Sequence, residues 1–430
     1  MTWIAVVLSC CAFLWGDEEP PLALVGGAML SVDGDAESKT EVILIRDGVI
    51  EAVGTDIEVP YDARRVDVTG LYVSPVFQDG WMESDLNFLE HTKMQGVPVD
   101  VGRDALASMS VGERTGLAPE RRAWEGLPTV LPEQGDHRSA GFGAVVVAPD
   151  GMILAGSGAA LHLNGHPLRE SHLDTDVAQF GSLSWRGGWG GRGENVYPST
   201  LMGVMAHLRQ VLLDASHRKD IADRNRSGRT TSFPVQDRVL LALEAVIGGE
   251  QPLILAVQTE EDIRLAIQLT EEFPGLRVGI AGGKEAWQVA DLLAQKKIPV
   301  LLDLRFGDEP EQPGSKPKNK RASDSSRPEA ESADSDQEET PKGADRPPPF
   351  DPGLPARVLR HRHDEWLENV AGIEVLFAAG VNVAFASMGR TAEELLKDLR
   401  VAVEKGALQE KHAMRALTSA LDVVSGVDGE

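Results

Sequence analysis

The chain has 430 residues, 42% of them hydrophobic and 25% charged, which is the composition of an ordinary soluble globular protein with a large core. Its formal net charge of −25 argues against a nucleic-acid partner, because so acidic a chain offers little to neutralise phosphates. We interpret the negative charge as a source of solubility.

The first sixteen residues form one apolar run, and the acidic, proline-rich stretch from Asp17 to Pro21 follows at once. This run is too short for a stable membrane span, but it suits the core of a secretory signal, although no Lys or Arg precedes it. We therefore predict a signal segment (signal peptide) at 1–16 and a secreted, periplasmic or cell-envelope location. Lipid attachment at Cys10, which follows Val7-Leu8-Ser9, and a buried amino-terminal strand are the alternatives. If the leader is removed, no cysteine remains for disulfide or thiolate chemistry.

The segment 17–74 has the pattern of a small β domain. Asp47-Gly48 lies between two alternating apolar runs and predicts a hairpin, because a type I′ turn needs positive φ at both central residues. So small a segment is not expected to be stable alone, and we expect it to pack as a sheet against the rest of the chain. The predicted strands are 22–25, 41–45, 49–53 and 65–68.

The two parts 75–306 and 357–426 predict the first and last portions of an α/β barrel. Strands separated by single helices imply parallel pairing with right-handed crossovers, and a (β/α)8 barrel closes so many units naturally. Thr259 and Thr391 are placed to cap helices, and Gly406 to end one. Among the strands we predict 142–149, 151–163, 252–257, 276–280, 298–304 and 381–386. Among the helices we predict 199–217, 235–247, 259–273, 284–295, 364–379, 391–405 and 408–424.

Between these parts, 307–356 is rich in charged, Ser and Pro residues. Almost no large apolar residue stands between Phe306 and Phe350, so the segment cannot bury enough surface to offset its ordering entropy. We predict a disordered insert within the barrel and not a domain linker, because β/α units resume after it.

The stretch Val66–Leu86, VDVTGLYVSPVFQDGWMESDL, together with the hairpin before it, resembles the amidohydrolase superfamily in its imidazolonepropionase-like branch. In that branch a segment D-x-T-G-x-x-x-x-P-G-[LF]-I-D-x-H-x-H joins a β-sandwich to a (β/α)8 barrel, and its two histidines bind a metal. The resemblance implies a composite domain, a TIM-like barrel with a small amino-terminal β-sandwich. It also implies the family activity, metal-dependent hydrolysis of non-peptide C–N bonds such as those of cyclic amides, with Zn or another divalent metal.

The resemblance covers nearly the whole chain after the leader. Phrases such as YPSTLMGVMAHLRQVLLDA look like the first unit of large secreted tandem amidohydrolases, a unit that is typically degraded in its metal site. This implies a second, active amidohydrolase unit as partner. Relatives continue beyond the position of Gly426 with a segment that returns to the sandwich, whereas this chain stops at Glu430. We therefore expect either the front part of a longer polypeptide or a sandwich left incomplete at its carboxyl end.

The positions that carry metal ligands in active relatives are occupied here by Trp81, Glu83, Ala256, Gly282 and Met388. Four of these residue types supply no suitable N or O ligand, and a lone glutamate would bind an ion only weakly. Without a metal, nothing lowers the pKa of a water molecule or polarises the scissile carbonyl. We therefore predict no catalytic residue, no metal and no cofactor, and a pseudoenzyme that acts as a scaffold or ligand-binding unit.

Two sets of histidines offer alternative ligands. His361 and His363 would point the same way on a strand, which would allow an active hydrolase with unorthodox ligands that include Glu83. Since they stand near an expected helix start, capping residues are the competing interpretation. His162 and His166, with His172 soon after, have metal-like spacing, but Asn, Gly and Pro between and after them favour a polar loop.

A third function class is an envelope barrel that binds small molecules. The glycine-rich segment Gly181–Gly193 carries Trp185 and Trp189, which together with Trp81 could form an apolar surface for a ligand. The segment has neither a nucleophile-elbow motif around Ser184 nor a phosphate-loop motif. A loop over the barrel mouth is the competing interpretation.

Overall fold

The computed structural model describes residues 20–30, 42–84, 86, 88, 116–151, 153–183, 198, 200–234, 236–310 and 355–426, and the backbone of Ser38 and Lys39. The predicted signal segment 1–16, most of the predicted insert, and Trp185 and Trp189 lie outside the described residues. No helix among the described residues is both long enough and apolar enough to cross a membrane.

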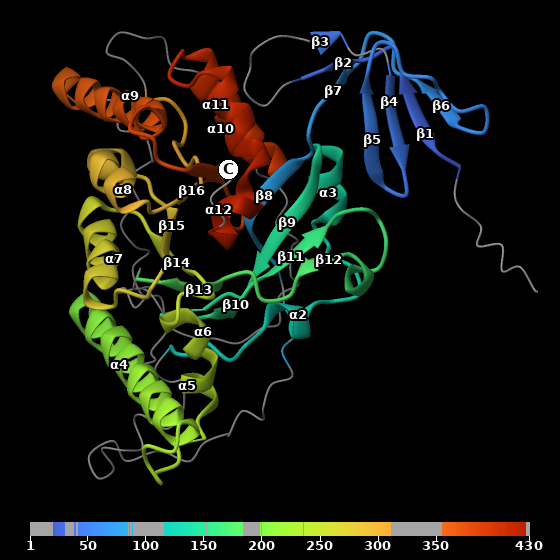
Figure 1. Cartoon of the computed structure of the whole chain (residues 1–430). Coiled ribbons are helices and arrows are strands. Elements are labelled where there is room, and N and C mark those ends of the chain that lie inside the picture. The colour runs from blue at the N-terminus through green and yellow to red at the C-terminus, as the bar shows by residue number, and fades with distance from the viewer. Residues whose placement is uncertain are drawn as a thin grey trace, which may run out of the picture.

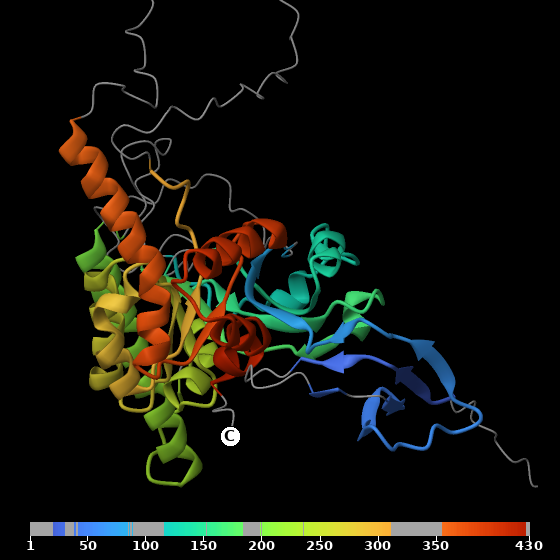
Figure 2. The same cartoon turned by 90° about the horizontal axis from the view of Figure 1, so that it is seen from above.

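The amino-terminal strands form two small sheets that stand to one side of the main body (Figures 1 and 2). The first has the order β5-β4-β1-β6 and the second the order β3-β2-β7. The predicted hairpin is confirmed, because β4 and β5 pair across Asp47 and Gly48, both of which have positive φ. The strands are β1 (Leu22–Val25), β2 (Ala28–Met29), β3 (Ser38–Lys39), β4 (Val42–Arg46), β5 (Val49–Gly54), β6 (Arg64–Asp67) and β7 (Tyr72–Val73). That the two sheets make a β-sandwich stays a prediction.

The main body contains a four-stranded sheet, β12-β11-β9-β8, and a six-stranded sheet, β10-β13-β14-β15-β16-β17. Strands β13 to β17 are all parallel. The β/α alternation predicted β14 to β17, whereas β13 was not among the predicted strands. The strands are β8 (Phe77–Glu83), β9 (Phe142–Ala148), β10 (Gly156–Ser157), β11 (Ala159–His162), β12 (His172–Asp174), β13 (Gln179–Ser182), β14 (Leu253–Val257), β15 (Val278–Gly282), β16 (Val300–Leu302) and β17 (Val383–Phe385).

One segment breaks the parallel pattern. Residues 156–162 run antiparallel to both neighbours, since β10 pairs with β13 and β11 pairs with β9. Gly158 lies between the two pairings, where a Cβ would be 2.4 Å from the Phe180 ring. The segment therefore joins β10, an edge strand of the six-stranded sheet, to β11, an interior strand of the four-stranded sheet, through one short bend.

At the other side of the body, the end of β17 lies beside β8. The Met388 N–H donates to the Trp81 carbonyl at 2.9 Å, and the Ser387 hydroxyl donates to the same oxygen at 3.3 Å. The described residues contain no β-ladder between β17 and β8. A fully closed eight-stranded barrel therefore stays a prediction, although the two ends of the strand series are in contact.

Helices follow the parallel strands and cover the outer face of the sheet (Figure 1). They are α2 (Ala123–Gly126), α3 (Gln134–Ser139), α4 (Leu201–Arg226), α5 (Arg238–Ala242), α6 (Glu244–Ile247), α7 (Glu260–Glu272), α8 (Ala290–Lys296), α9 (Ala356–Ala378), α10 (Ala392–Glu404), α11 (Glu410–Thr418) and α12 (Ala420–Ser425), with 3-10 turns η1 (Leu168–Glu170) and η2 (Ala286–Val289).

Capping residues in the sequence predicted the starts of some of these helices correctly, but the start of one helix was predicted wrongly. The Thr391 capping box is formed with Glu394, and the Thr259 hydroxyl accepts from the Asp262 N–H at the start of α7. The predicted start of a helix at 364 is wrong, because α9 begins at Ala356 after Pro355. Proline is favoured around the first turn, since its missing N–H has no partner to lose there.

Alternation along the strands divides the core into two clusters. In β16, Val300 and Leu302 belong to the outer cluster between sheet and helices, whereas Leu301 belongs to the inner cluster. The inner cluster is closed at one end by Ala420 and Val423 of α12. Successive side chains of a strand point to opposite faces, so each strand supplies both clusters.

Candidate functional site

Three of the five metal-ligand-equivalent positions are part of the inner apolar cluster. Trp81 and Met388 are buried members, and Ala256 packs against the cluster while partly exposed. The Trp81 ring meets Phe180 edge to face, with centroids 4.7 Å apart. The indole N–H of Trp81 is buried without a hydrogen-bond partner. At these three positions the side chains are apolar and pack in one cluster.

The other two ligand-equivalent positions, Glu83 and Gly282, do not supply the metal ligands that the first three lack. Glu83 is exposed at the end of β8, and its carboxylate lies against Gly389, where a Cβ would be 2.6 Å from Oε2. Gly282 has φ of +87°, and a Cβ there would be 2.3 Å from the Gln258 side-chain nitrogen. Only glycine adopts that conformation without strain, so a histidine would fit poorly at this position.

The donor set therefore does not match the divalent metal that the family resemblance implies. Indole, methyl and glycine positions offer no ligand, and the Met388 thioether is a soft ligand that does not suit a hydrolytic Zn site. Among the described residues, no group of three or more His, Cys, Asp or Glu side chains is arranged to hold a metal ion.

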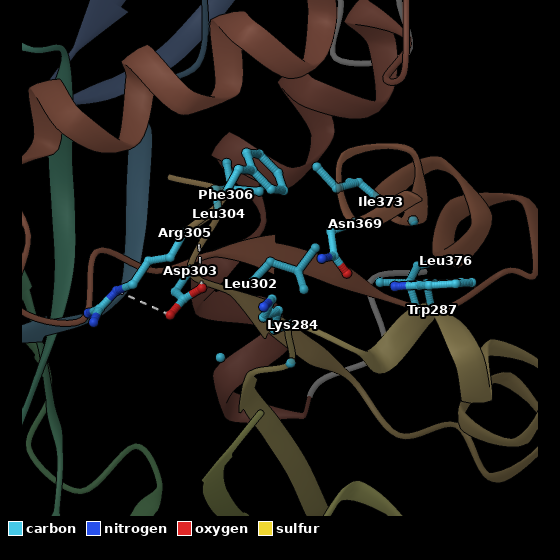
Figure 3. Close-up of a pocket in the computed structure, with 13 residues that line it drawn as sticks. Lys284, Trp287, Leu302, Asp303, Leu304, Arg305, Phe306, Asn369, Ile373 and Leu376 are labelled. Atoms are coloured by element: carbon cyan, nitrogen blue, oxygen red, sulfur yellow. Dashed lines mark hydrogen bonds and ion pairs between the residues drawn. The ribbon is translucent and has the colours of Figure 1, made fainter. Parts of the chain in front are cut away.

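A polar group that the sequence did not reveal lies at the carboxyl ends of β14 to β17. Asp303 follows β16 and is buried, and Arg305 approaches it with Nε 3.3 Å from Oδ2 (Figure 3). The Arg305 guanidinium also donates to the Met388 carbonyl, and that of Arg390 to the Asp303 carbonyl. The only signal in the sequence is an aspartate directly after an apolar strand.

Burial is the largest influence on the pKa of Asp303 and raises it above its ordinary value. The Arg305 N–H, the charges of Arg305 and Arg390, and the Gln258 side chain act in the opposite direction without cancelling it. A carboxyl group is costly to ionise where water is excluded. Because Asp303 is bound to Arg305, we assign it the role of holding strand ends together.

The same strand ends contain two strained residues. Leu304 and Met388 have φ of 50° and 46°, although neither is glycine, and both are buried. Such conformations cost about 1–3 kcal/mol each and persist only where the surroundings enforce them. Beside these residues, the Arg305 guanidinium donates to the Met388 carbonyl and the Arg390 guanidinium to the carbonyl of Asp303, the residue before Leu304.

A second buried polar group joins β8 to α3. His137 Nε2 lies 3.0 Å from Asp79 Oδ2, and the two side chains are 2% and 0% exposed. Asp79 Oδ1 accepts from the N–H groups of Trp81 at 3.1 Å and of Ser387 at 2.9 Å. One carboxylate therefore ties together β8, α3 and the end of β17.

The His137 ring is hydrogen-bonded at both nitrogens, since Nδ1 lies 3.1 Å from the Glu133 carbonyl. Burial by itself lowers the pKa of His137, but the hydrogen bond and charge of Asp79, with smaller contributions from Glu133, raise it overall. The carboxylate of Asp79 and the carbonyl of Glu133 are both acceptors, so together they favour the imidazolium form of His137. No motif or apolar pattern around His137 in the sequence indicates this pair.

The alternative histidine ligands do not converge. His361 and His363 lie two residues apart on α9, where helical geometry turns them to different faces. His361 is exposed, whereas His363 is buried with Nε2 3.3 Å from Glu309 Oε1. The pKa of Glu309 is held below its usual range by the Lys405 hydrogen bond first and by His363 as well.

The loop histidines are also apart from any ligand cluster. His162, His166 and His172 are all exposed, and the ring of His172 packs at 4.9 Å from that of Trp124. In the glycine-rich segment, Gly181–Leu183 complete β13 and the residue after it, and the remainder lies outside the described residues.

Comparison with known proteins supports the fold. The amidohydrolase from Thermotoga maritima MSB8 superposes with a TM-score of 0.66 over 94% of this chain and 89% of its own, at 19% sequence identity. At this identity the similarity shows the fold alone, so the chain has an α/β fold like that of this amidohydrolase. The resemblance seen in the sequence is thus confirmed at the level of the fold.

Weaker similarities add nothing to the argument. A prolidase in complex with N-methylphosphonate-L-proline has a TM-score of 0.47 at 14% identity, with 95% of this chain and 88% of that chain covered. The ochratoxinase of A. niger has a TM-score of 0.43 at 13% identity, with 95% and 85% covered. Neither a protein-family model nor a curated protein matches the chain.

Proposed function

We propose that this chain is a non-catalytic member of the amidohydrolase superfamily, close to the imidazolonepropionase-like branch, that acts as a scaffold or ligand-binding unit. One observation carries the proposal: Trp81, Ala256 and Met388, at three ligand-equivalent positions, pack into the inner apolar cluster. A hydrolytic metal site needs several N or O ligands that converge on an open position. An apolar cluster at these positions provides neither the ligands nor the opening.

The wider family features belong to the same proposal. They are a closed (β/α)8 barrel, a small amino-terminal β-sandwich, and partnership with a second, active amidohydrolase unit. The contact between the end of β17 and β8 supports the closed barrel. A secreted, periplasmic or cell-envelope location rests on the apolar segment 1–16 alone.

The decisive experiment measures metal content and hydrolysis together. We expect the purified protein to hold much less than one Zn, Mn or Fe per chain after dialysis, and to leave cyclic amides intact when these ions are added. A His361→Ala/His363→Ala double variant should have the same metal content as the wild type. Stoichiometric metal that is lost in the double variant would establish an active hydrolase with unorthodox ligands.

Partnership is tested separately. A second amidohydrolase unit with an intact H-x-H motif, when produced with this chain, should co-purify with it through size-exclusion chromatography. Independent elution of the two proteins at micromolar concentration would contradict the scaffold role and leave ligand binding as the remaining function.

A further inference from the structure

A short segment, residues 306–310, follows the carboxyl end of β16 and lies against helices α9 and α10. We call it the strap. Leu304, with φ of 50°, turns the chain out of the strand just before the strap begins. The indole N–H of Trp366 on α9 donates to the Gly307 carbonyl at 3.3 Å. The strap is therefore attached to α9 through its own backbone.

The side chain of Glu309 joins the strap to two helices. Both of its carboxylate oxygens accept from the ammonium group of Lys405 at the end of α10, at 3.0 and 2.9 Å. Its Oε1 also lies 3.3 Å from Nε2 of His363 on α9. Lys405 Nζ is 5.7 Å from the centroid of the Trp366 ring, so the cation lies between a carboxylate and an indole face. We call these four residues the clasp.

The clasp is ionic and accessible to solvent. The side chains of Lys405 and Glu309 are 38% and 33% exposed. An ion pair so exposed contributes little to stability, and dissolved salt screens it. The pKa of Glu309 is lowered, by the Lys405 hydrogen bond first and by His363 as well, so the carboxyl group is charged at neutral pH. The clasp can therefore be released when other ions compete for Lys405.

The strap forms part of the wall of a narrow crevice at the carboxyl ends of β15 and β16. Phe306 lines the crevice on the side of the strap, and Ile373 and Leu376 line it on the side of α9 (Figure 3). Its volume is about 30 Å³, which is room for about two water molecules. Gly282 also lines it, so the crevice lies at the same strand ends as the ligand-equivalent positions.

The chain just before the strap is anchored independently of the clasp. The Arg305 guanidinium donates to the Met388 carbonyl, and its Nε lies 3.3 Å from Asp303 Oδ2. None of these contacts involves the clasp. Release of the clasp would therefore let the strap swing about this anchored turn and carry Phe306 away from α9.

We propose that the strap closes the crevice while the clasp is formed, and that it opens when dissolved ions compete with Glu309 for Lys405. Opening exposes the apolar side chains that line the crevice, among them Leu302 and Ile373, and gives a small apolar ligand access to the strand ends. The device goes beyond the proposed function, because it needs neither a metal nor a partner unit.

Hydrogen–deuterium exchange of the full chain, resolved into peptides by mass spectrometry, measures opening of the strap. Glu309→Gln keeps the shape of the side chain and removes its charge, so the amides of 304–310 should exchange about threefold faster than in the wild type. In the wild type, raising NaCl from about 0.1 M to about 1 M should give a similar increase, because salt screens the clasp. The variant should respond little to salt.

Glu374→Gln is the matched control for this change. Glu374 also lies on α9, and its carboxylate is 2.9 Å from His412 Nδ1 and accepts from the Gln409 amide at 2.6 Å. These bonds join α9 to the start of α11. The control should leave exchange of 304–310 unchanged, so it separates loss of the clasp from a general loosening of α9.

Opening of the crevice itself is measured by thiol labelling. In a background with Cys10→Ser and Cys11→Ser, the substitution Ile373→Cys places a thiol in the crevice, at a position that is 3% exposed. Labelling of this thiol should be faster when Glu309→Gln is added. Leu212→Cys, fully buried on α4, reports unfolding of the whole chain and should be labelled at the same rate with and without that change.

Several results would overturn the proposal. They are equal exchange of 304–310 in wild type and Glu309→Gln, an increase that Glu374→Gln shares, and wild-type exchange that does not respond to salt. Unchanged labelling at position 373, or an equal rise for the two thiols, would also contradict it. None of these measurements involves metal content or hydrolysis of cyclic amides, so the proposed function is judged separately.

Discussion

Replacing Asp79 with Asn removes one charge from a buried pair and leaves its shape. The amide oxygen can still accept from the N–H groups of Trp81 and Ser387, so those two backbone bonds persist. What is lost is the charged hydrogen bond to His137, and such bonds contribute about 1.5–3 kcal/mol. Because both side chains are almost fully buried, solvent does not screen the loss. We expect Asp79→Asn to lower the free energy of unfolding by this amount at pH 6.

The effect should depend on pH in a defined direction. The pKa of His137 is raised above its ordinary value of 6.5, so the stabilisation is complete below that pH and is lost as the pH rises through the raised pKa. In the variant, the amide nitrogen can donate to a neutral imidazole, which removes the dependence. The difference in stability between wild type and variant should therefore shrink as the pH increases above 6.5.

Urea unfolding followed by tryptophan fluorescence, at a series of pH values from about 5.5 to 8.5, measures this difference. His137→Gln serves as the matched variant, since it removes the titrating ring and should show the same flattened pH dependence. A stability difference that stays constant with pH, or that grows as the pH rises, would refute the assignment of an imidazolium to this pair.

Three further changes test other parts of the molecule. Trp81→Ala should lower the free energy of unfolding by about 3–5 kcal/mol in urea denaturation, because it leaves a cavity in the inner cluster. Trp81→Phe should cost much less, because it keeps a ring and removes an N–H that has no hydrogen-bond partner. Because the pKa of Asp303 is raised, ionising Asp303 opposes folding, so the wild type should lose stability relative to the Asp303→Asn variant as the pH rises from about 4 to about 7. Thermal melts of both proteins at the two pH values measure this difference, and an unchanged difference would contradict the raised pKa. Thr391→Ala should cost about 1 kcal/mol by removing the capping box of α10, and an unchanged melting temperature would contradict it.

Local chemistry made part of the fold predictable. The Asp47-Gly48 hairpin depends on two positive φ angles, and the Thr391 box on residues three apart. The parallel strands β14 to β17 followed from apolar runs that alternate with amphipathic helices. By contrast, the beginning of α9 at Ala356 was missed, because charged residues near its amino end hide the apolar face.

The residues of the polar groups could not be found in the same way. Asp79 and His137 are 58 positions apart, and Arg390 and Asp303 are 87 apart. Nothing in their neighbouring residues marks them, because their partners are supplied by other strands and helices. The antiparallel course of 156–162 was hidden for the same reason, since strand direction depends on which neighbours the segment meets.

The sequence by itself determined the α/β pattern, the resemblance to amidohydrolases, and the identity of the residues at the ligand-equivalent positions. Only the tertiary structure decided what those residues do. Trp81 and Met388 come from opposite ends of the chain, and they meet because β17 lies beside β8. A sequence records which residues stand at the ligand-equivalent positions, whereas packing decides whether the space around them is open or filled.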